Sequence, residues 1–325
     1  MILQDIESKK GQLVTGYYKF ASMSDGTEIR FPVMIAEGMQ EGKTLVINAA
    51  IHGEEFGGSV SLIRFMKELD LTTLKGTIIA VPVVNILGFW TLTRTTEMDG
   101  FNLNRVFPGT VHNSFTHQMA NAYFQEIACK GDYVIDLHSG GLAADVPLYS
   151  IYHPATNTPA EQVAREMCRH CGSPIIWKIR TVNGLGNSLG ANVTLQGIPC
   201  VTIECDGGEV HEETINRYLS AVTNIAKYLG FIPGEAPTQE KYLVLNEGSF
   251  VYNRCGGFFQ TEHKAGDCLH KGDVVGRIMN TLGEIVEEVV CEEDYACLTA
   301  LCRENQPLHS GQLIAEVIPV ESEEA

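Results

Sequence analysis

Residues 44–58, TLVINAAIHGEEFGG, decide the fold, because they contain a complete transition from a strand to a tight turn. The apolar run Leu45-Val46-Ile47 predicts a buried strand. The glycines that follow allow the backbone to turn sharply and leave room for a ligand. This turn brings His52 and Glu55, three residues apart, to the end of the strand. An imidazole and a carboxylate at that spacing are suitable ligands for Zn²⁺, although most such pairs in proteins are accidental.

Outward from this stretch, buried strands alternate with amphipathic helices. Apolar strands are predicted at 44–51, 76–84, 133–137 and 199–203, and helices at 59–69, 117–128, 161–170 and 213–229. This alternation predicts an α/β fold with a mostly parallel mixed sheet and helices on both faces. Residues 1–40 alternate apolar and polar positions around a turn at 24–26, which predicts N-terminal strands. The segment 85–109 is expected to be a long irregular loop, and loops of that length are usually functional.

Composition excludes several classes of partner. The chain has 325 residues with 23 Lys and Arg against 40 Asp and Glu, a net charge of −17. Such an acidic balance argues against nucleic-acid and membrane-surface partners. We find no secretion signal and no run of 18 apolar residues, so no membrane segment is expected. The ten cysteines are scattered without a disulfide-framework spacing, which predicts a reduced, cytoplasmic protein.

Three predicted strand ends carry ionisable side chains: His52 with Glu55, then His138, then Glu204. Ligands of open α/β sheets bind outside the carboxyl ends of the strands. A catalytic zinc site uses three protein ligands and keeps one position open for water. We therefore predict one Zn²⁺ per chain, bound by His52, Glu55 and His138. Glu204 is the spare carboxylate, suited to take a proton from the activated water and pass it to a leaving nitrogen.

Asp136 lies two residues before His138, on the same side of the strand. It either orients this histidine as a hydrogen-bond acceptor or is satisfied by the backbone. The sequence leaves both readings open.

The motifs together resemble one known family. They are HGEE at 52–55 with Gly57 and Gly58, NLNRVFPG at 102–109, DLH at 136–138, and the strand end at Glu204. This combination resembles the succinylglutamate desuccinylase/aspartoacylase family, within the zinc carboxypeptidase-like fold, over about residues 40–230. The resemblance implies hydrolysis of the amide bond of a small anionic N-acyl amino acid, with the zinc ligands and the general acid/base named above.

The resemblance also assigns residues in the loop at 85–109. It implies that Asn104 and Arg105 bind a substrate carboxylate. It implies that Arg94 polarises the scissile carbonyl and stabilises the oxyanion, a role for a side chain that stays protonated.

The sequence beyond a Pro- and Gly-rich linker at 230–239 predicts only short strands and turns. We therefore predict a catalytic domain at 1–235, which includes the N-terminal strands at 1–40, and an all-β domain at 236–325. The stretches GDVVGRI and GEIVEEV resemble a biotinyl/lipoyl sandwich, but the hairpin tip at 279–283 has no lysine to carry a group. The module is expected to pack on the catalytic domain, to narrow its cleft, or to form an interface in a homo-oligomer.

Two alternatives to an N-acyl amino acid hydrolase stay open. One is a metallocarboxypeptidase that acts on peptides and needs an open groove. The other is a zinc-containing binding protein without turnover, against which the intact Glu204 argues. The family also includes deacylation of N-acetyl-diaminobutyrate, and the sequence does not rank acyl groups.

Overall fold

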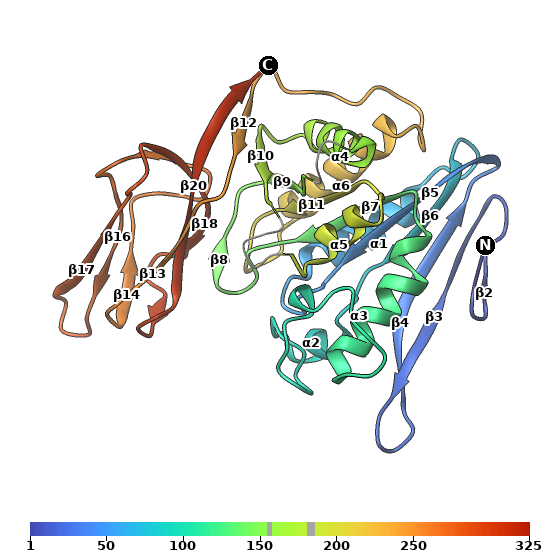
Figure 1. Ribbon diagram of the computed structural model, residues 1–325, viewed down its shortest axis with the longest axis horizontal. Helices are drawn as coiled ribbons and strands as arrows, with labels where there is room; N and C mark the ends of the chain where they lie inside the picture. The colour runs from blue at the N-terminus through green and yellow to red at the C-terminus, as the bar shows by residue number, and fades with distance from the viewer. Residues whose placement is uncertain (155–157, 181–185) are drawn as a thin grey trace.

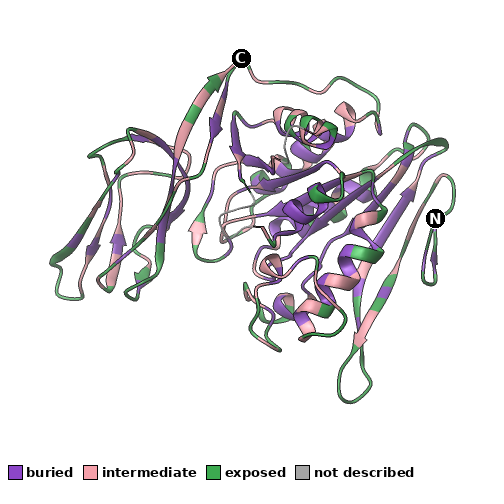
Figure 2. Cartoon of the chain, viewed as in Figure 1, coloured by how far each residue is buried: buried purple, intermediate pink, exposed green. Residues whose placement is uncertain are grey.

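A sheet of fourteen strands runs through most of the protein (Figure 1). The computed structural model describes residues 1–154, 158–180 and 186–325. In Figure 1 the N-terminal hairpin lies at one end of the molecule, the C-terminal strands lie at the other, and the helices cover the middle. Figure 2 shows that the central strands are buried and that the exposed residues gather on outer turns and helix faces.

The four apolar strands predicted from the sequence lie side by side at the centre of this sheet and are parallel. Their order is β6 (Lys75–Val81), β5 (Gln40–Ala49), β7 (Tyr133–His138) and β11 (Cys200–Glu204). Because the strands are parallel, their carboxyl ends meet at one edge. This arrangement confirms the prediction for the central strands and brings the polar strand ends together.

Further strands extend the sheet on both sides and make it mixed. On one side lie β4 (Glu28–Glu37) and β3 (Gln12–Ser22), antiparallel as predicted. On the other side the order is β9 (Tyr149–Tyr152), β10 (Ile175–Lys178), β12 (Tyr242–Leu245), β20 (Leu313–Glu324), β18 (Tyr295–Cys302) and β15 (Cys268–His270). β9 runs antiparallel to β11. The mostly parallel character therefore holds for the centre of the sheet and not for its flanks.

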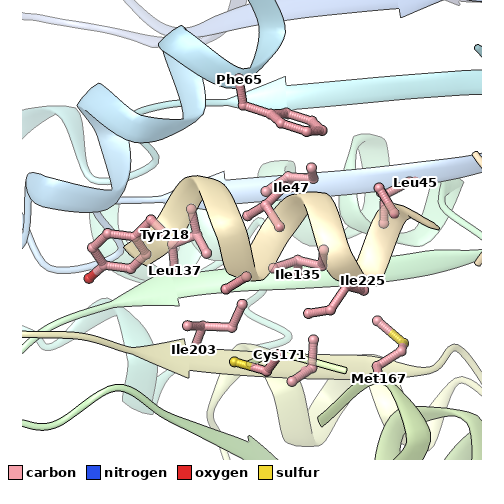
Figure 3. Close-up of a cluster of buried hydrophobic side chains, with 14 of the residues drawn as sticks. Leu45, Ile47, Phe65, Ile135, Leu137, Met167, Cys171, Ile203, Tyr218 and Ile225 are labelled. Carbon is pink, nitrogen blue, oxygen red and sulfur yellow. The ribbon is translucent and has the colours of Figure 1, made fainter. Parts of the chain in front are cut away.

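Helices cover both faces of the central strands, as predicted. One face carries α1 (Gly57–Glu68), α4 (Pro159–Arg169) and α6 (Glu212–Tyr228), and the other carries α3 (Phe115–Glu126) and α5 (Leu189–Leu195). Alternate residues of one strand serve the two faces: Leu45 and Ile47 pack toward α1 and α6, whereas Val46 packs with the α3 side. Figure 3 shows the first of these clusters, in which Phe65 and Tyr218 lie over Ile47 and Leu137.

Two glycines in and after the turn at residues 52–58 are required by close packing. A Cβ on Gly58 would lie 2.8 Å from the Cβ of Leu137, so glycine lets α1 approach the sheet closely. A Cβ on Gly53 would lie 1.9 Å from the backbone carbon of Gly88, in the short helix α2 (Ile86–Thr91). This helix lies in the segment predicted to be irregular. The packing of α2 against the turn fixes the backbone next to His52.

Every element after α6 is a strand. The strands not yet named are β13 (Ser249–Tyr252), β14 (Gly257–Gln260), β16 (Val274–Met279), β17 (Ile285–Val290) and β19 (Pro307–Leu308). Four of them form a separate sheet in the order β17-β16-β14-β19. The all-β character of the C-terminal region is therefore confirmed, whereas the boundary at residue 235 and the biotinyl/lipoyl resemblance stay predictions.

Short elements complete the chain. They are β1 (Ile2–Leu3), β2 (Ile6–Glu7), β8 (Ala144–Asp145), and the 3-10 turns η1 (Leu103–Arg105) and η2 (Ala128–Lys130). Among the helices in the described ranges, none is both long and apolar enough to cross a membrane.

Candidate active site

Two histidines and a glutamate converge at the carboxyl ends of β5 and β7. Nδ1 of His52 lies 2.7 Å from Oε1 of Glu55, and Nδ1 of His138 lies 2.8 Å from Oε2 of the same carboxylate. All three side chains are buried, with at most 3% of each residue exposed. Their ligand atoms lie within 4.8 Å of one another. The structure therefore brings the three predicted metal ligands to one point.

The far nitrogen of each histidine ring also faces an acceptor. Nε2 of His138 lies 3.1 Å from Oδ2 of Asp136, and Nε2 of His52 lies 3.1 Å from Oδ1 of Asn102. A neutral imidazole carries one N–H, so it can donate to only one of two acceptors. Burial lowers the pKa of His52 to about 4, so this ring is neutral at pH 7.

These contacts fit a metal ion. Burial alone would lower the pKa of His138, but the Asp136 and Glu55 carboxylates raise it, so a bound metal ion would have to displace a proton from this ring. If both rings are neutral and their outer nitrogens donate to Asp136 and Asn102, the Nδ1 lone pairs of both rings point toward the Glu55 carboxylate. Three electron-pair donors then face one another in a buried space, which is unfavourable without a cation between them. Two imidazoles and a carboxylate, with the rings held from behind by acceptors, could hold a metal ion and are the kinds of ligand that zinc sites use.

Asp136 contacts the His138 ring, as its predicted role in orienting this histidine requires. One carboxylate oxygen accepts from His138, and the other accepts from Nδ2 of Asn48 at 2.5 Å. The pattern of alternate residues along β7 places Asp136 and His138 on the same side of the strand. Its effect on metal affinity stays a prediction.

Asn102 was missed as a site residue, although it belongs to the NLNR motif. Its side-chain oxygen contacts His52 and also accepts from the backbone N–H of Asn104 at 2.9 Å, which starts η1. Nothing in the sequence around Asn102 indicates that its side chain contacts His52, which lies fifty residues earlier. Only the folding of the loop over the turn at His52 reveals this contact.

We predict that Asn102→Ala weakens metal binding about 10- to 100-fold, because the His52 ring loses the acceptor that fixes its orientation. Affinity is measured by competition with a chromophoric chelator. Asn102→Asp keeps an acceptor oxygen and should retain most of the affinity. An alanine variant that binds the ion as tightly as the wild type would show that Asn102 only starts the 3-10 turn.

Glu204 ends β11 directly beside the predicted metal ligands, because its register partner on β7 is His138. It lines the pocket in front of the two histidines. It has no hydrogen-bond partner within the described ranges. Burial raises the pKa of Glu204 to about 8; the nearby Glu55 and Glu316 carboxylates add to this, and His138 opposes it. A carboxyl that titrates near neutral pH suits a group that must both accept and release a proton.

Arg94 comes from the loop after α2 and reaches the same carboxylate as the histidines. Its Nη1 donates to Oε1 of Glu55 at 2.8 Å. Burial alone would lower the pKa of Arg94, but Glu55 and Glu204 raise it above its ordinary value, so the guanidinium stays charged. Its other donors have no partner in the part of the chain that the structure describes. Arg94 also lines the pocket, so these donors are available to a bound molecule.

Asn104 and Arg105 lie in η1 and line the same cavity as Phe250 and Glu316, which are far away in the sequence. Oδ1 of Asn104 accepts from the backbone N–H of Leu189 at 2.8 Å, which fixes the start of α5 and leaves the side-chain amide N–H groups for another acceptor. Nη1 of Arg105 donates to the backbone oxygen of Asn104 at 2.8 Å. Both residues are held without losing their donors toward the pocket.

The pocket is small, with a volume of about 100 Å³. Its lining includes the predicted residues His52, Arg94, Asn104, Arg105, His138 and Glu204. Further lining residues were not predicted: Tyr149, Ile151, His153, Trp177, Ile179, Ser188, Thr202, Phe250 and Glu316. Most of them belong to the C-terminal strands or to β9 and β10, two strands that were not predicted from the sequence. The C-terminal region thus forms part of the pocket wall.

The family described as the succinylglutamate desuccinylase/aspartoacylase catalytic domain matches residues 41–229. The N-alpha-acetyl-L-2,4-diaminobutyric acid deacetylase of Halomonas elongata is 25% identical over 297 residues, which span 90% of this chain and 86% of that protein.

Solved structures share the fold along nearly the whole chain. A succinylglutamate desuccinylase/aspartoacylase from Rhodobacter sphaeroides has a TM-score of 0.86 at 20% identity and covers 98% of both chains. The product-bound ectoine utilization protein EutE from Ruegeria pomeroyi has a TM-score of 0.85 at 22% identity and covers 96% of both chains. Because the coverage is nearly complete, these similarities include the C-terminal strands.

Proposed function

Because the chain belongs to the succinylglutamate desuccinylase/aspartoacylase family, we propose that it hydrolyses the amide bond of a small N-acyl amino acid with one bound zinc ion. The observation that carries this proposal is the buried set of His52, Glu55 and His138 beside the carboxylate of Glu204. When bound, the ion supplies a Lewis acid that polarises the scissile carbonyl and makes water acidic enough to be deprotonated.

The residues of the chain perform the proton transfers. Glu204 takes a proton from the attacking water, and the amide carbonyl carbon becomes tetrahedral. Glu204 then gives this proton to the leaving nitrogen, so the C–N bond breaks to a carboxylate and an amine. The raised pKa of Glu204 supports this double role, because the same group must act as base and then as acid.

The arginines would hold the substrate. Arg105 and Asn104 are proposed to bind the α-carboxylate, because a guanidinium fork and an amide N–H suit two carboxylate oxygens. Arg94 is proposed to stabilise the oxyanion, since it is charged, lies against the ligand Glu55 and has donors to spare.

The size of the pocket favours a small substrate over a peptide. The cavity volume is only about 100 Å³, and Phe250 from β13 forms part of its wall, which supports a small acylated substrate. The relative from Halomonas elongata is named a deacetylase, which supports acetyl as the acyl group here. All ten cysteines are free, which supports our expectation of a reducing, cytoplasmic compartment.

A substrate panel tests the proposal. Zinc-loaded protein is given N-acetyl and N-succinyl amino acids, their α-methyl esters and peptides with free carboxyl ends, and the released amine is quantified. We expect kcat/KM for at least one free N-acyl amino acid to exceed that for its ester and for the peptides about 10-fold or more, because the ester lacks the charge that Arg105 binds. Faster cleavage of peptides would support the carboxypeptidase alternative, and no hydrolysis of any amide would support the binding protein.

A further inference from the structure

One carboxylate in the pocket wall is not used by the proposed reaction. Glu316 belongs to β20 and lines the same cavity as Glu204. Its neighbours along the strand are apolar, and Ile314 and Ile318, two residues away on either side, are buried in hydrophobic clusters. A carboxylate that is partly removed from water is unfavourable without a partner.

A β-bulge determines where this carboxylate lies. The register between β18 and β20 shifts between Leu298 and Ala300, so Thr299 is an extra residue opposite Glu316. Bulges change the direction of side chains and occur next to active sites. The Thr299 hydroxyl is fully buried and donates to Oε2 of Glu316 at 3.0 Å. The bulge therefore fixes one carboxylate oxygen, and Oε1 has no hydrogen-bond partner among the described residues.

No cation of the described chain neutralises this carboxylate by direct contact. Arg94 forms its ion pair with Glu55, and Arg105 donates to the backbone of Asn104. Both guanidinium groups act on Glu316 only from a longer distance, where they partly oppose the burial that raises its pKa. Glu316 thus retains the capacity to bind a positive group that enters the pocket.

The other walls near Glu316 are suited to the same kind of group. Tyr149, Trp177 and Phe250 line the cavity, and the rings of Tyr149 and Trp177 lie 6.2 Å apart between centroids. The electric field of Glu316 reaches Tyr149, where it contributes to a raised phenol pKa. Aromatic faces attract ammonium groups. A carboxylate with aromatic neighbours favours an ammonium and disfavours a second carboxylate.

We propose that Glu316 is a specificity-determining residue that selects N-acyl amino acids whose side chain ends in an ammonium group. This inference rests on the proposed function and refines it. The α-carboxylate goes to Arg105 and Asn104, and the side-chain ammonium goes to Glu316. The substrate is therefore zwitterionic, whereas the sequence predicted an anionic one.

Two isosteric probes test this assignment. N-α-acetyl-2,4-diaminobutyrate and N-acetylnorvaline have side chains of the same length, one ending in an ammonium group and the other in a methyl group. We expect wild-type kcat/KM to be at least about 10-fold higher for the ammonium probe, because hydrogen bonds to charged groups are strong when water is excluded. In Glu316→Gln this ratio should fall about 10- to 100-fold. In Thr299→Val it should fall less, because the carboxylate remains but is no longer held.

Matched variants complete the test. Glu323→Gln makes the same change at an exposed position of β20 and should keep the wild-type ratio. Glu316→Lys should favour N-acetylaspartate over the ammonium probe. A wild type that hydrolyses both isosteric probes equally, or a Glu316→Gln variant whose ratio stays within about twofold, would overturn the inference and leave the proposed function intact. Hydrolysis of none of the probes would overturn the proposed function, and this inference with it.

Discussion

Glu204→Gln is expected to lower kcat about 10²- to 10⁴-fold while the metal content of the protein stays unchanged. Glutamine has nearly the same shape as glutamate but cannot accept and return a proton. Glu204 makes no contact that the fold needs, since it has no hydrogen-bond partner within the described ranges and ends β11 at the pocket. The rate is measured with the best substrate of the panel, and zinc is measured by elemental analysis of the same sample.

The control for this experiment is Glu209→Gln, which makes the same substitution at an exposed position five residues further along the chain. It should keep the wild-type kcat. A Glu204→Gln enzyme that retains its zinc and its full rate would remove Glu204 from the mechanism and require another base in the pocket.

His52→Ala and His138→Ala are each expected to lose the metal and all measurable activity. Wild-type protein should contain about one zinc ion per chain, because the site offers three ligands and one open position. Removal of one imidazole leaves only two ligands, the other imidazole and the Glu55 carboxylate. Elemental analysis after dialysis measures occupancy. Thermal unfolding supplies a second readout, because zinc at 1,000 times its Kd should stabilise the wild type by about 4 kcal/mol and leave both variants unchanged.

His112→Ala is the matched control, since this histidine is exposed and lies outside the pocket. It should bind zinc as the wild type does. If wild-type protein took up no metal even after zinc was added, the convergence of His52, Glu55 and His138 would be a structural hydrogen-bond cluster. The binding-protein alternative would then lose its zinc as well.

The central part of the site was predictable because its residues follow strong local signals. His52 follows an apolar strand, His138 and Glu204 each end one, and parallel strands place their carboxyl ends at one edge of the sheet. The family resemblance added Arg94, Asn104 and Arg105, and the structure places all three in the same pocket.

The remaining parts of the site depend on contacts that no local pattern encodes. β9 and β10 have only four residues each, too few to show periodicity, so the aromatic wall of Tyr149 and Trp177 was missed. The role of Asn102 depends on how a loop folds over His52. The sequence does contain one indication of Glu316. It is the one acidic residue in the otherwise apolar run LIAEVIPV, and an acidic residue within an apolar strand indicates a candidate site residue.

The pairing of β12 and β20 with the main sheet limits which substitutions these strands tolerate. β12 covers the edge of β10, and β20 covers β12, so the strands at the middle of the molecule offer no open edge to another chain. The strand β20 also delivers Glu316 to the pocket. β20 thus both covers a sheet edge and carries the proposed specificity residue. A substitution in β20 that changes substrate preference can therefore also disturb the pairing that covers β12.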